Sequence, residues 1–358
     1  MDTLTGHAIL ADAATGGRVF QVDVVFDRGV YLPELDLWLD SLRKRDTSVV
    51  SHAHSDHIAR HSSPVLTRRT RILLGDYYQR SQPVELEYGE PLETPEYSIT
   101  LHPAGHCLGS AQALVVNRQS GERLLYTGDL RMQPSPINEP AEAVPCDTLV
   151  IESTYGRPDY VFPPQEEAIA TAVRVIGQWL GQGAIPVVLG WRLGKAQEAL
   201  HHLLTAGFGV VCEESVHDIA RRYESGGVTF PGEYRVFDGD FRDGEVGIFP
   251  PGRKSREQIS QSIQPGRSVR YLELTGWAAG KGEKPWGRGR PGDSSLPYSD
   301  HADFSDLVSY VEAVQPKRVY TVFGFPDLAA HLRQHGYAAS HLGKNATPGD
   351  QAMQMPLL

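Results

Sequence analysis

Four side chains of the kinds that bind transition metals lie within six consecutive positions, directly after an apolar pair. The segment reads His-x-His-x-Asp-His and contributes His52, His54, Asp56 and His57. On an extended segment, side chains two positions apart point the same way, so His52 and His54 can bind one ion together. Asp56 and His57 follow the turn and can bind a second ion. Imidazole and carboxylate are common zinc ligands, and two such ions can activate water and hold a phosphate.

Such a centre needs further ligands from other strand ends, and the sequence offers three. His106 lies in a Gly-His-Cys-Leu-Gly loop after the strand-like run 97–102. Asp129 follows an apolar strand that ends in Thr-Gly, and its carboxylate is the right group to bridge two cations. His301 lies far along the chain in Ser-Asp-His-Ala-Asp. Each could be an ordinary loop residue alone, but their shared placement after apolar strands predicts one metal centre.

The order His-x-His-x-Asp-His, Gly-His, Thr-Gly-Asp resembles the metallo-β-lactamase fold. Two further segments, 151–156 (Ile-Glu-Ser-Thr-Tyr-Gly) and 299–304 (Ser-Asp-His-Ala-Asp-Phe), resemble motifs A and B of its β-CASP branch. That branch of nucleic-acid nucleases includes bacterial ligase-associated DNA exonucleases, the Artemis/Pso2 DNA-repair nucleases and mRNA 3′-end-processing endonucleases. The resemblance covers roughly residues 30–330. It implies an α/β fold, a four-layer αββα sandwich with an inserted parallel α/β cap domain.

The resemblance also implies two divalent ions, zinc in the first place and manganese as the alternative. The ligands of the first metal would be His52, His54, His106 and Asp129. Those of the second would be Asp56, His57 and the bridging Asp129. Asp56 would also orient the attacking water.

Other residues would act around the ions by the same resemblance. Asp40 would orient the ligand loop without binding a metal, with nearby Asp36 and a merely solvated carboxylate as alternatives. Glu152 would pair with His301 and set its tautomer. His301 would then hydrogen-bond the scissile phosphate or protonate the leaving oxygen. The phosphate would be contacted by the amides and hydroxyls of Ser153 and Thr154.

One position departs from the RNA-processing members, which carry a metal-binding His after the strand corresponding to 318–322. Here that strand leads into Phe323, which cannot bind a metal. The second site therefore lacks one protein ligand. The DNA-repair members also have an apolar residue at this point, so Phe323 favours DNA as the substrate.

Composition limits the class of protein. The chain has 358 residues, enough for two domains, and a hydrophobic fraction of 40%, enough for a sizeable core. Its three cysteines are widely spaced and odd in number, which predicts no disulfide framework and fits a reducing compartment. We expect neither a signal peptide nor a membrane span, hence a cytoplasmic protein without a membrane partner.

The net charge of −10 is not typical of a nucleic-acid-binding protein, although two divalent ions would offset several of the acidic groups. A local basic segment with an interleaved Trp offers nucleic-acid contacts instead. Its candidate residues are Lys281, Lys284, Trp286, Arg288 and Arg290. A solvated flexible loop is the alternative interpretation. A second basic run, 67–71, is interpreted as a solvated face.

The order of apolar runs predicts the domains. After Gly156 a helical period in 165–182 is followed by a strand at 185–189, a helix from Gly194 and a strand at 209–212, the alternation typical of a parallel sheet. Gly194-Lys195 lacks the upstream Gly and the Ser or Thr of a phosphate-binding loop. The predicted parts are a metallo-β-lactamase domain in two pieces, 1–156 and 296–358, and a cap domain, 157–295.

The function predicted from these features is metal-dependent hydrolysis of DNA phosphodiester bonds. We expect a single-strand-preferring exonuclease in DNA repair, with a ligase or a helicase as a possible partner. An RNA-processing ribonuclease of the same fold is the first alternative. A small-molecule hydrolase, such as a lactonase, thioesterase or β-lactamase, is the second, and motifs A and B argue against it. A non-catalytic scaffold is disfavoured because the ligand set is intact.

Overall fold

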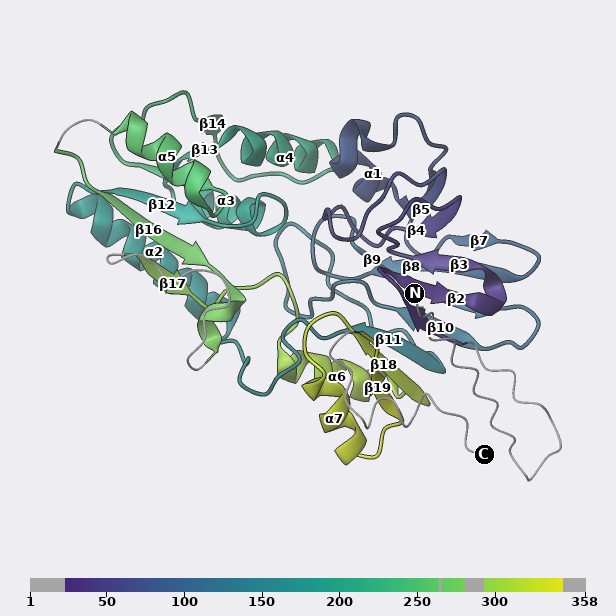
Figure 1. The fold of residues 1–358 in the computed structure, drawn as a ribbon. Coiled ribbons are helices and arrows are strands. Elements are labelled where there is room, and N and C mark those ends of the chain that lie inside the picture. The colour runs from purple at the N-terminus through teal and green to yellow at the C-terminus, as the bar shows by residue number, and fades with distance from the viewer. Residues whose placement is uncertain (1–22, 264–265, 281–292, 344–358) are drawn as a thin grey trace.

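The computed structural model describes residues 23–263, 266–280 and 293–343, and its strands form three sheets (Figure 1). The first contains β1 Val25–Phe26, β2 Val30–Leu32, β3 Leu37–Leu39, β4 Thr47–Val49, β5 Ser63–Thr67 and β6 Val84–Leu86. The second contains β7 Pro91–Glu93, β8 Tyr97–Pro103, β9 Ala111–Asn117, β10 Arg123–Tyr126, β11 Thr148–Glu152, β18 Arg318–Val322 and β19 Ala339–His341. The third contains β12 Ile185–Leu189, β13 Gly209–Cys212, β14 Tyr234–Val236, β15 Glu245–Phe249, β16 Val269–Leu274 and β17 Ser294–Leu296.

Helices connect and cover these sheets. The α-helices are α1 Arg68–Leu74, α2 Gln165–Gly181, α3 Lys195–Thr205, α4 Glu214–Ser225, α5 Arg253–Ser262, α6 Phe304–Val314 and α7 Asp327–Gln334. Three short 3₁₀ turns are η1 Pro33–Leu35, η2 Gly75–Tyr78 and η3 Gly276–Ala279. No helix in the described ranges has both the length and the apolar character to cross a bilayer.

The first two sheets pack face to face. One buried cluster contains both Val65 of β5 and Val150 of β11, so it fills the space between the two sheets. Because side chains alternate along a strand, neighbouring Leu66 points away from this core and packs with α1 instead. The far side of the second sheet packs against α6 and α7 in a separate cluster. Helix, sheet, sheet and helix follow one another, which confirms the predicted four-layer architecture.

The third sheet is parallel throughout. Its strand β12 is buried on both faces, with Val188 in the cluster shared with α2, α3 and α4 and Val187 in the cluster shared with α5. This helix-covered sheet is the parallel α/β unit that the apolar pattern predicted, and Figure 1 shows it at one end of the molecule. We keep the domain division as a proposal, and note that β17 crosses the boundary predicted at residue 295.

Candidate metal centre

The site residues follow strands whose carboxyl ends meet at one edge of the second sheet. β10, β11 and β18 pair in parallel, and two antiparallel steps through β9 give β8 the same direction. The loops after these strands therefore begin side by side. They carry His106 after β8, Asp129 after β10 and Phe323 after β18, while Glu152 ends β11. The histidine-rich loop follows β4 of the facing sheet.

Three imidazole nitrogens and one carboxylate oxygen converge between these loops. His54 Nδ1 lies 3.0 Å from His52 Nε2 and 3.0 Å from His106 Nε2. Asp129 Oδ2 lies 3.4 Å from His52 Nε2 and 3.6 Å from His106 Nε2. Zinc ligands at 2.0–2.1 Å in a tetrahedron lie roughly 3.3 Å apart. The spacing of the four atoms therefore fits the shell of a single ion.

The hydrogen bonds behind two of the rings fix which nitrogen faces the centre. His54 Nε2 donates to the carbonyl of Leu193 at 3.2 Å, and His106 Nδ1 donates to the carbonyl of Asp300 at 2.7 Å. A carbonyl only accepts, so these nitrogens carry the protons and the opposite nitrogens present lone pairs to each other. Burial lowers the pKa of both rings and favours these neutral forms. Facing lone pairs repel unless a cation lies between them.

His52 also turns a nitrogen lone pair to the centre, because Ser51 links its other ring nitrogen to Asp40. The Ser51 hydroxyl donates to Asp40 Oδ2 at 2.5 Å, and it lies 2.9 Å from His52 Nδ1. Its one proton is already given to the carboxylate, so it accepts from Nδ1–H and leaves His52 Nε2 as a lone pair. Burial again lowers the pKa of His52. All three histidines are thus arranged as neutral metal ligands, which is the fit expected of a divalent cation site.

Asp129 also faces a second set of groups. Its Oδ2 lies 3.4 Å from His57 Nε2 and 3.9 Å from His301 Nε2, so one carboxylate oxygen adjoins both sets. The ring of Phe323 lies 5.2 Å from that of His57, centroid to centroid, so a side chain that cannot bind a metal occupies this position. Asp56 is exposed and belongs to none of the four potential ligand groups among the described residues. Its role as a ligand stays a prediction.

Asp40 holds the ligand loop from behind. Its buried carboxylate accepts from the Ser51 amide at 2.7 Å, the His57 Nδ1–H at 2.8 Å and the Tyr126 hydroxyl at 2.7 Å, besides the Ser51 hydroxyl. Three segments of the chain are therefore tied to one side chain. Asp36, the alternative at the sequence level, is exposed. The geometry favours Asp40 as the residue that orients His57.

Glu152 and His301 form the expected couple. Both Glu152 oxygens lie 3.1 Å from His301 Nδ1, and the carboxylate is also held by the Leu130 amide at 2.6 Å. Burial alone would lower the pKa of His301, but the carboxylates of Glu152 and Asp129 outweigh it and raise the pKa to about 9. Because Glu152 occupies the Nδ1 side of the ring, Nε2 is the nitrogen that faces the centre.

Ser153 and Thr154, the two predicted phosphate contacts, differ in how many of their donor groups are already hydrogen-bonded within the protein. The Ser153 amide donates to the Val322 carbonyl at 2.9 Å, and the Ser153 hydroxyl donates to the Phe323 carbonyl, with the Val322 carbonyl 3.2 Å away. Both of its donors are therefore engaged within the protein. Thr154 is partly exposed, and among the described residues its amide alone has a partner, Glu152 Oε2 at 3.4 Å. Of the pair, Thr154 is the better placed for a substrate phosphate.

Two buried ion pairs at the centre escaped the sequence analysis. Lys195 Nζ lies 3.1 Å from Asp300 Oδ1, and Arg131 binds Glu198 through two contacts at 2.6 and 2.9 Å. All four side chains are buried. Each pair links helix α3 to a residue within two positions of a site residue, Asp129 or His301. The sequence offered little signal for them, since Lys195 and Glu198 lie in a polar first turn of α3.

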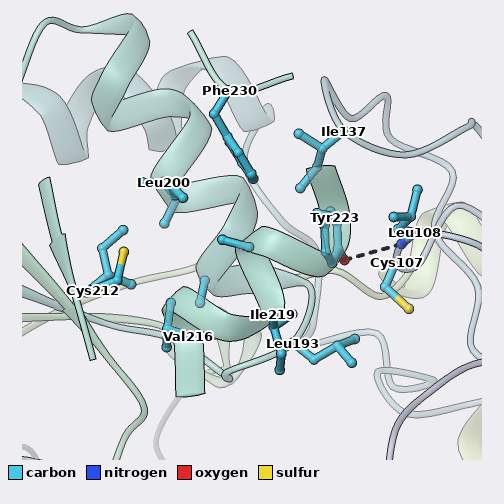
Figure 2. Close-up of a cluster of buried hydrophobic side chains, with 14 of the residues drawn as sticks. Cys107, Leu108, Ile137, Leu193, Leu200, Cys212, Val216, Ile219, Tyr223 and Phe230 are labelled. Atoms are coloured by element: carbon cyan, nitrogen blue, oxygen red, sulfur yellow. Dashed lines mark hydrogen bonds between the residues drawn. The ribbon is translucent and has the colours of Figure 1, made fainter. Parts of the chain in front are cut away.

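The loop that carries His106 also packs against the helices that cover the third sheet. Figure 2 shows Cys107 and Leu108 beside Tyr223 of α4, whose hydroxyl accepts from the Leu108 amide at 3.3 Å. Cys107 is buried in this apolar cluster, and burial raises the pKa of its thiol. Its place in the cluster indicates a packing role rather than metal ligation. The basic residues Lys281, Lys284, Trp286, Arg288 and Arg290 lie outside the described residues.

The chain is similar to several known proteins. Residues 294–347 match the family model RMMBL, a Zn-dependent metallo-hydrolase RNA specificity domain. The chain is 38% identical over 327 residues to a protein of Opitutus terrae described as a probable DNA ligase, a match that covers 90% of this chain and 31% of the relative. It is 31% identical over 203 residues to the transcription termination factor FttA of Methanocaldococcus jannaschii, covering 47% of this chain and 32% of that protein.

The chain also resembles a second ligase and a solved structure. DNA ligase 6 of Arabidopsis thaliana is 26% identical over 304 residues, covering 77% of this chain and 21% of the relative. A solved structure of a protein of unknown function from Enterococcus faecalis matches with a TM-score of 0.56 at 14% identity, covering 84% of this chain and 80% of that one. The chain spans about a third of the length of the first curated relatives it matches. With its sheets and motifs, these matches place the chain in the β-CASP branch of the metallo-β-lactamase family.

Proposed function

We propose that this protein is a metal-dependent nuclease that hydrolyses DNA phosphodiester bonds, as a single-strand-preferring exonuclease with two divalent ions, zinc by preference. The observation that carries the proposal is the convergence of inward-facing lone pairs on His52, His54 and His106 beside the carboxylate of Asp129. A neighbouring imidazole held through Nδ1 by Glu152, that of His301, completes an arrangement suited to phosphoryl chemistry.

The side chains around the centre have separable tasks in this proposal. Divalent ions bound by the convergent groups would polarise the phosphate and lower the pKa of water. Glu152 fixes the His301 ring through Nδ1, so that the Nε2–H can donate to a phosphate oxygen or protonate the leaving oxygen. Thr154, at the rim of the same strand end, is the candidate for a further phosphate contact.

The choice of DNA rests on two observations. Phe323 occupies the position beside His57 where the RNA-processing members would place a metal ligand. The relative matched over 90% of this chain is described as a probable DNA ligase. A nuclease that trims ends would supply a ligase with joinable ends, so we propose a DNA ligase as the partner and keep a helicase as the alternative. Cytoplasmic location remains part of the proposal.

Ribonuclease activity is the second candidate function. The family model that matches residues 294–347 is described as an RNA specificity domain, and FttA is described as a transcription termination factor. Both descriptions favour RNA as strongly as the ligase description favours DNA. The substrate must therefore be decided by experiment.

The test is cleavage of end-labelled single-stranded DNA and of RNA of the same sequence. Chelator-stripped protein is assayed alone and after zinc or manganese is restored. Metal-dependent shortening of DNA alone supports the proposal, and the product ladder gives the polarity. Cleavage of RNA alone transfers the assignment to RNA processing. Cleavage of neither, together with hydrolysis of a lactone or thioester, would make this a small-molecule hydrolase.

Replacing His301 by glutamine should lower kcat about 10²–10⁴-fold, the contribution typical of a positioned acid or base. The first metal should stay bound, because His301 is not one of the four residues whose ligand atoms converge on it. Zinc per chain is measured by elemental analysis beside the rate. Loss of all zinc in this variant would contradict the division between metal-binding and proton-holding residues. Glu152→Gln should give a smaller loss, since it removes the support for the His301 proton but leaves the ring.

A further inference from the structure

The loop 190–194, between β12 and α3, lies against the metal centre. It leaves the carboxyl end of a parallel strand, the edge where open α/β sheets bind ligands. Its Leu193 carbonyl accepts the proton of His54 Nε2 at 3.2 Å. Trp191 is two residues earlier, and two residues span at most about 7 Å. The Cα of Trp191 therefore lies within about 7 Å of that of Leu193, the residue whose carbonyl binds His54.

Trp191 is exposed to an unusual degree for its type. Its relative exposure is 64%, and it is the one aromatic residue in the exposed class within residues 23–263, 266–280 and 293–343. The neighbouring Arg192 is exposed as well, and its guanidinium has no ion-pair partner in the described part of the chain. A large π face and an uncompensated cation are thus presented to solvent side by side.

The backbone beneath these two side chains is held in place. The Trp191 carbonyl accepts from the Ala196 amide at 3.1 Å, and the Arg192 carbonyl accepts from Gln197 Nε2 at 2.9 Å. The Gln197 oxygen in turn accepts from the Gly194 amide at 2.9 Å. Gln197 is fully buried. The loop is therefore fixed to the first turn of α3, and little backbone freedom has to be lost when it binds a ligand.

We propose that Trp191 and Arg192 form a nucleotide subsite beside the metal centre, in which the indole stacks on an unpaired base and the guanidinium contacts the adjoining phosphate. This inference rests on the proposed function and specifies how that site holds its substrate. Indole stacking accepts any base, because every base has a π face. In a duplex that face is covered by neighbouring bases, so the subsite selects single strands or frayed ends.

Binding and turnover measured on aromatic and aliphatic variants test the subsite. A fluorescein-labelled, phosphorothioate-linked single-stranded DNA reports Kd by anisotropy with zinc-loaded protein, and the unmodified strand reports KM and kcat. Trp191→Leu, which keeps an apolar side chain and loses the π face, should raise Kd and KM about ten-fold, with kcat changed much less. Trp191→Phe should recover most of the affinity. Arg192→Gln should raise Kd and flatten its salt dependence.

Val236→Ala is the matched control, since Val236 is also an exposed apolar residue, at the edge strand of the same sheet. It should bind DNA as the unchanged protein does. Equal affinity of Trp191→Leu and Trp191→Phe, or no binding of single-stranded DNA by the unchanged protein, would overturn the subsite. Trp191-dependent binding without any cleavage would support the subsite while refuting the nuclease. Cleavage of DNA with an affinity that does not depend on Trp191 would support the nuclease and refute the subsite.

Discussion

His54→Ala is expected to abolish phosphodiester hydrolysis while the fold survives. His54 Nδ1 is the shared neighbour of the other two inward-facing nitrogens, at 3.0 Å from each, so its loss opens the ligand shell. Several kcal/mol of charge stabilisation in the transition state depend on an intact metal site, which corresponds to a loss of about 10³-fold or more. The side chain is only partly buried, so its removal leaves no large cavity.

The measurements for His54→Ala are the initial rate on single-stranded DNA, zinc per chain by elemental analysis, and thermal unfolding by circular dichroism. His335→Ala is the matched control, because His335 is exposed near the end of α7 and belongs to none of the potential ligand groups among the described residues. It should keep its zinc and its rate. An undiminished rate in His54→Ala would mean that the metal centre has been assigned to the wrong residues.

Lys195→Met is expected to cost about 3–5 kcal/mol of unfolding free energy, the range for removing one partner of a buried ion pair. Burial opposes ionisation of Asp300, but the Lys195 ammonium 3.1 Å away helps hold the pKa of that carboxyl well below its usual value. Without Lys195 the carboxylate is left buried and uncompensated. Asp300 also accepts the His106 proton through its carbonyl, so we expect weaker zinc binding as well.

Chemical denaturation of the zinc-loaded protein measures the loss of unfolding free energy, and competition with a zinc chelator measures the weaker zinc binding. Lys195→Met/Asp300→Asn should recover part of the stability, because it removes the unpaired charge. Lys317→Met is the control for an exposed pair: Lys317 Nζ lies 2.8 Å from Asp147, and its side chain is 83% exposed. That change should cost about 1 kcal/mol or less. Equal costs for Lys195 and Lys317 would show that burial of the pair has no energetic role.

The sequence contained enough to predict the strand ends and the residues they present. The ligand loop is contiguous, and alternation or full burial of strands such as β8 and β11 follows directly from their apolar patterns. The helical period of α2 also predicted its position within two residues. These features depend on local sequence, whereas the four-layer arrangement of the sheets was implied only by the resemblance to the metallo-β-lactamase fold.

The contacts that orient the ligands could not be predicted in this way. His54 and Leu193 are 139 positions apart, and His106 and Asp300 are 194 apart. Both acceptors are backbone carbonyls, which every residue possesses, so no residue type marks them. Lys195 was considered only as part of a phosphate loop, and its pairing with Asp300 emerges only when α3 packs against the loop before α6. Tertiary packing, rather than composition, decides these contacts.

The carbonyl of Leu193 has a consequence for how the protein loads its ions. Leu193 lies between β12 and α3, in the part of the chain built on the third sheet, whereas His54 follows β4 of the first sheet. The Leu193 carbonyl nevertheless decides which ring nitrogen of His54 is free to bind a metal. If that unit moves away, the ring is free to turn and to change tautomer, and the preformed shell is lost. By reciprocity, an ion that prefers the preformed shell must strengthen the attachment of the unit by the same free energy. Metal loading and seating of the parallel sheet are thus one coupled equilibrium.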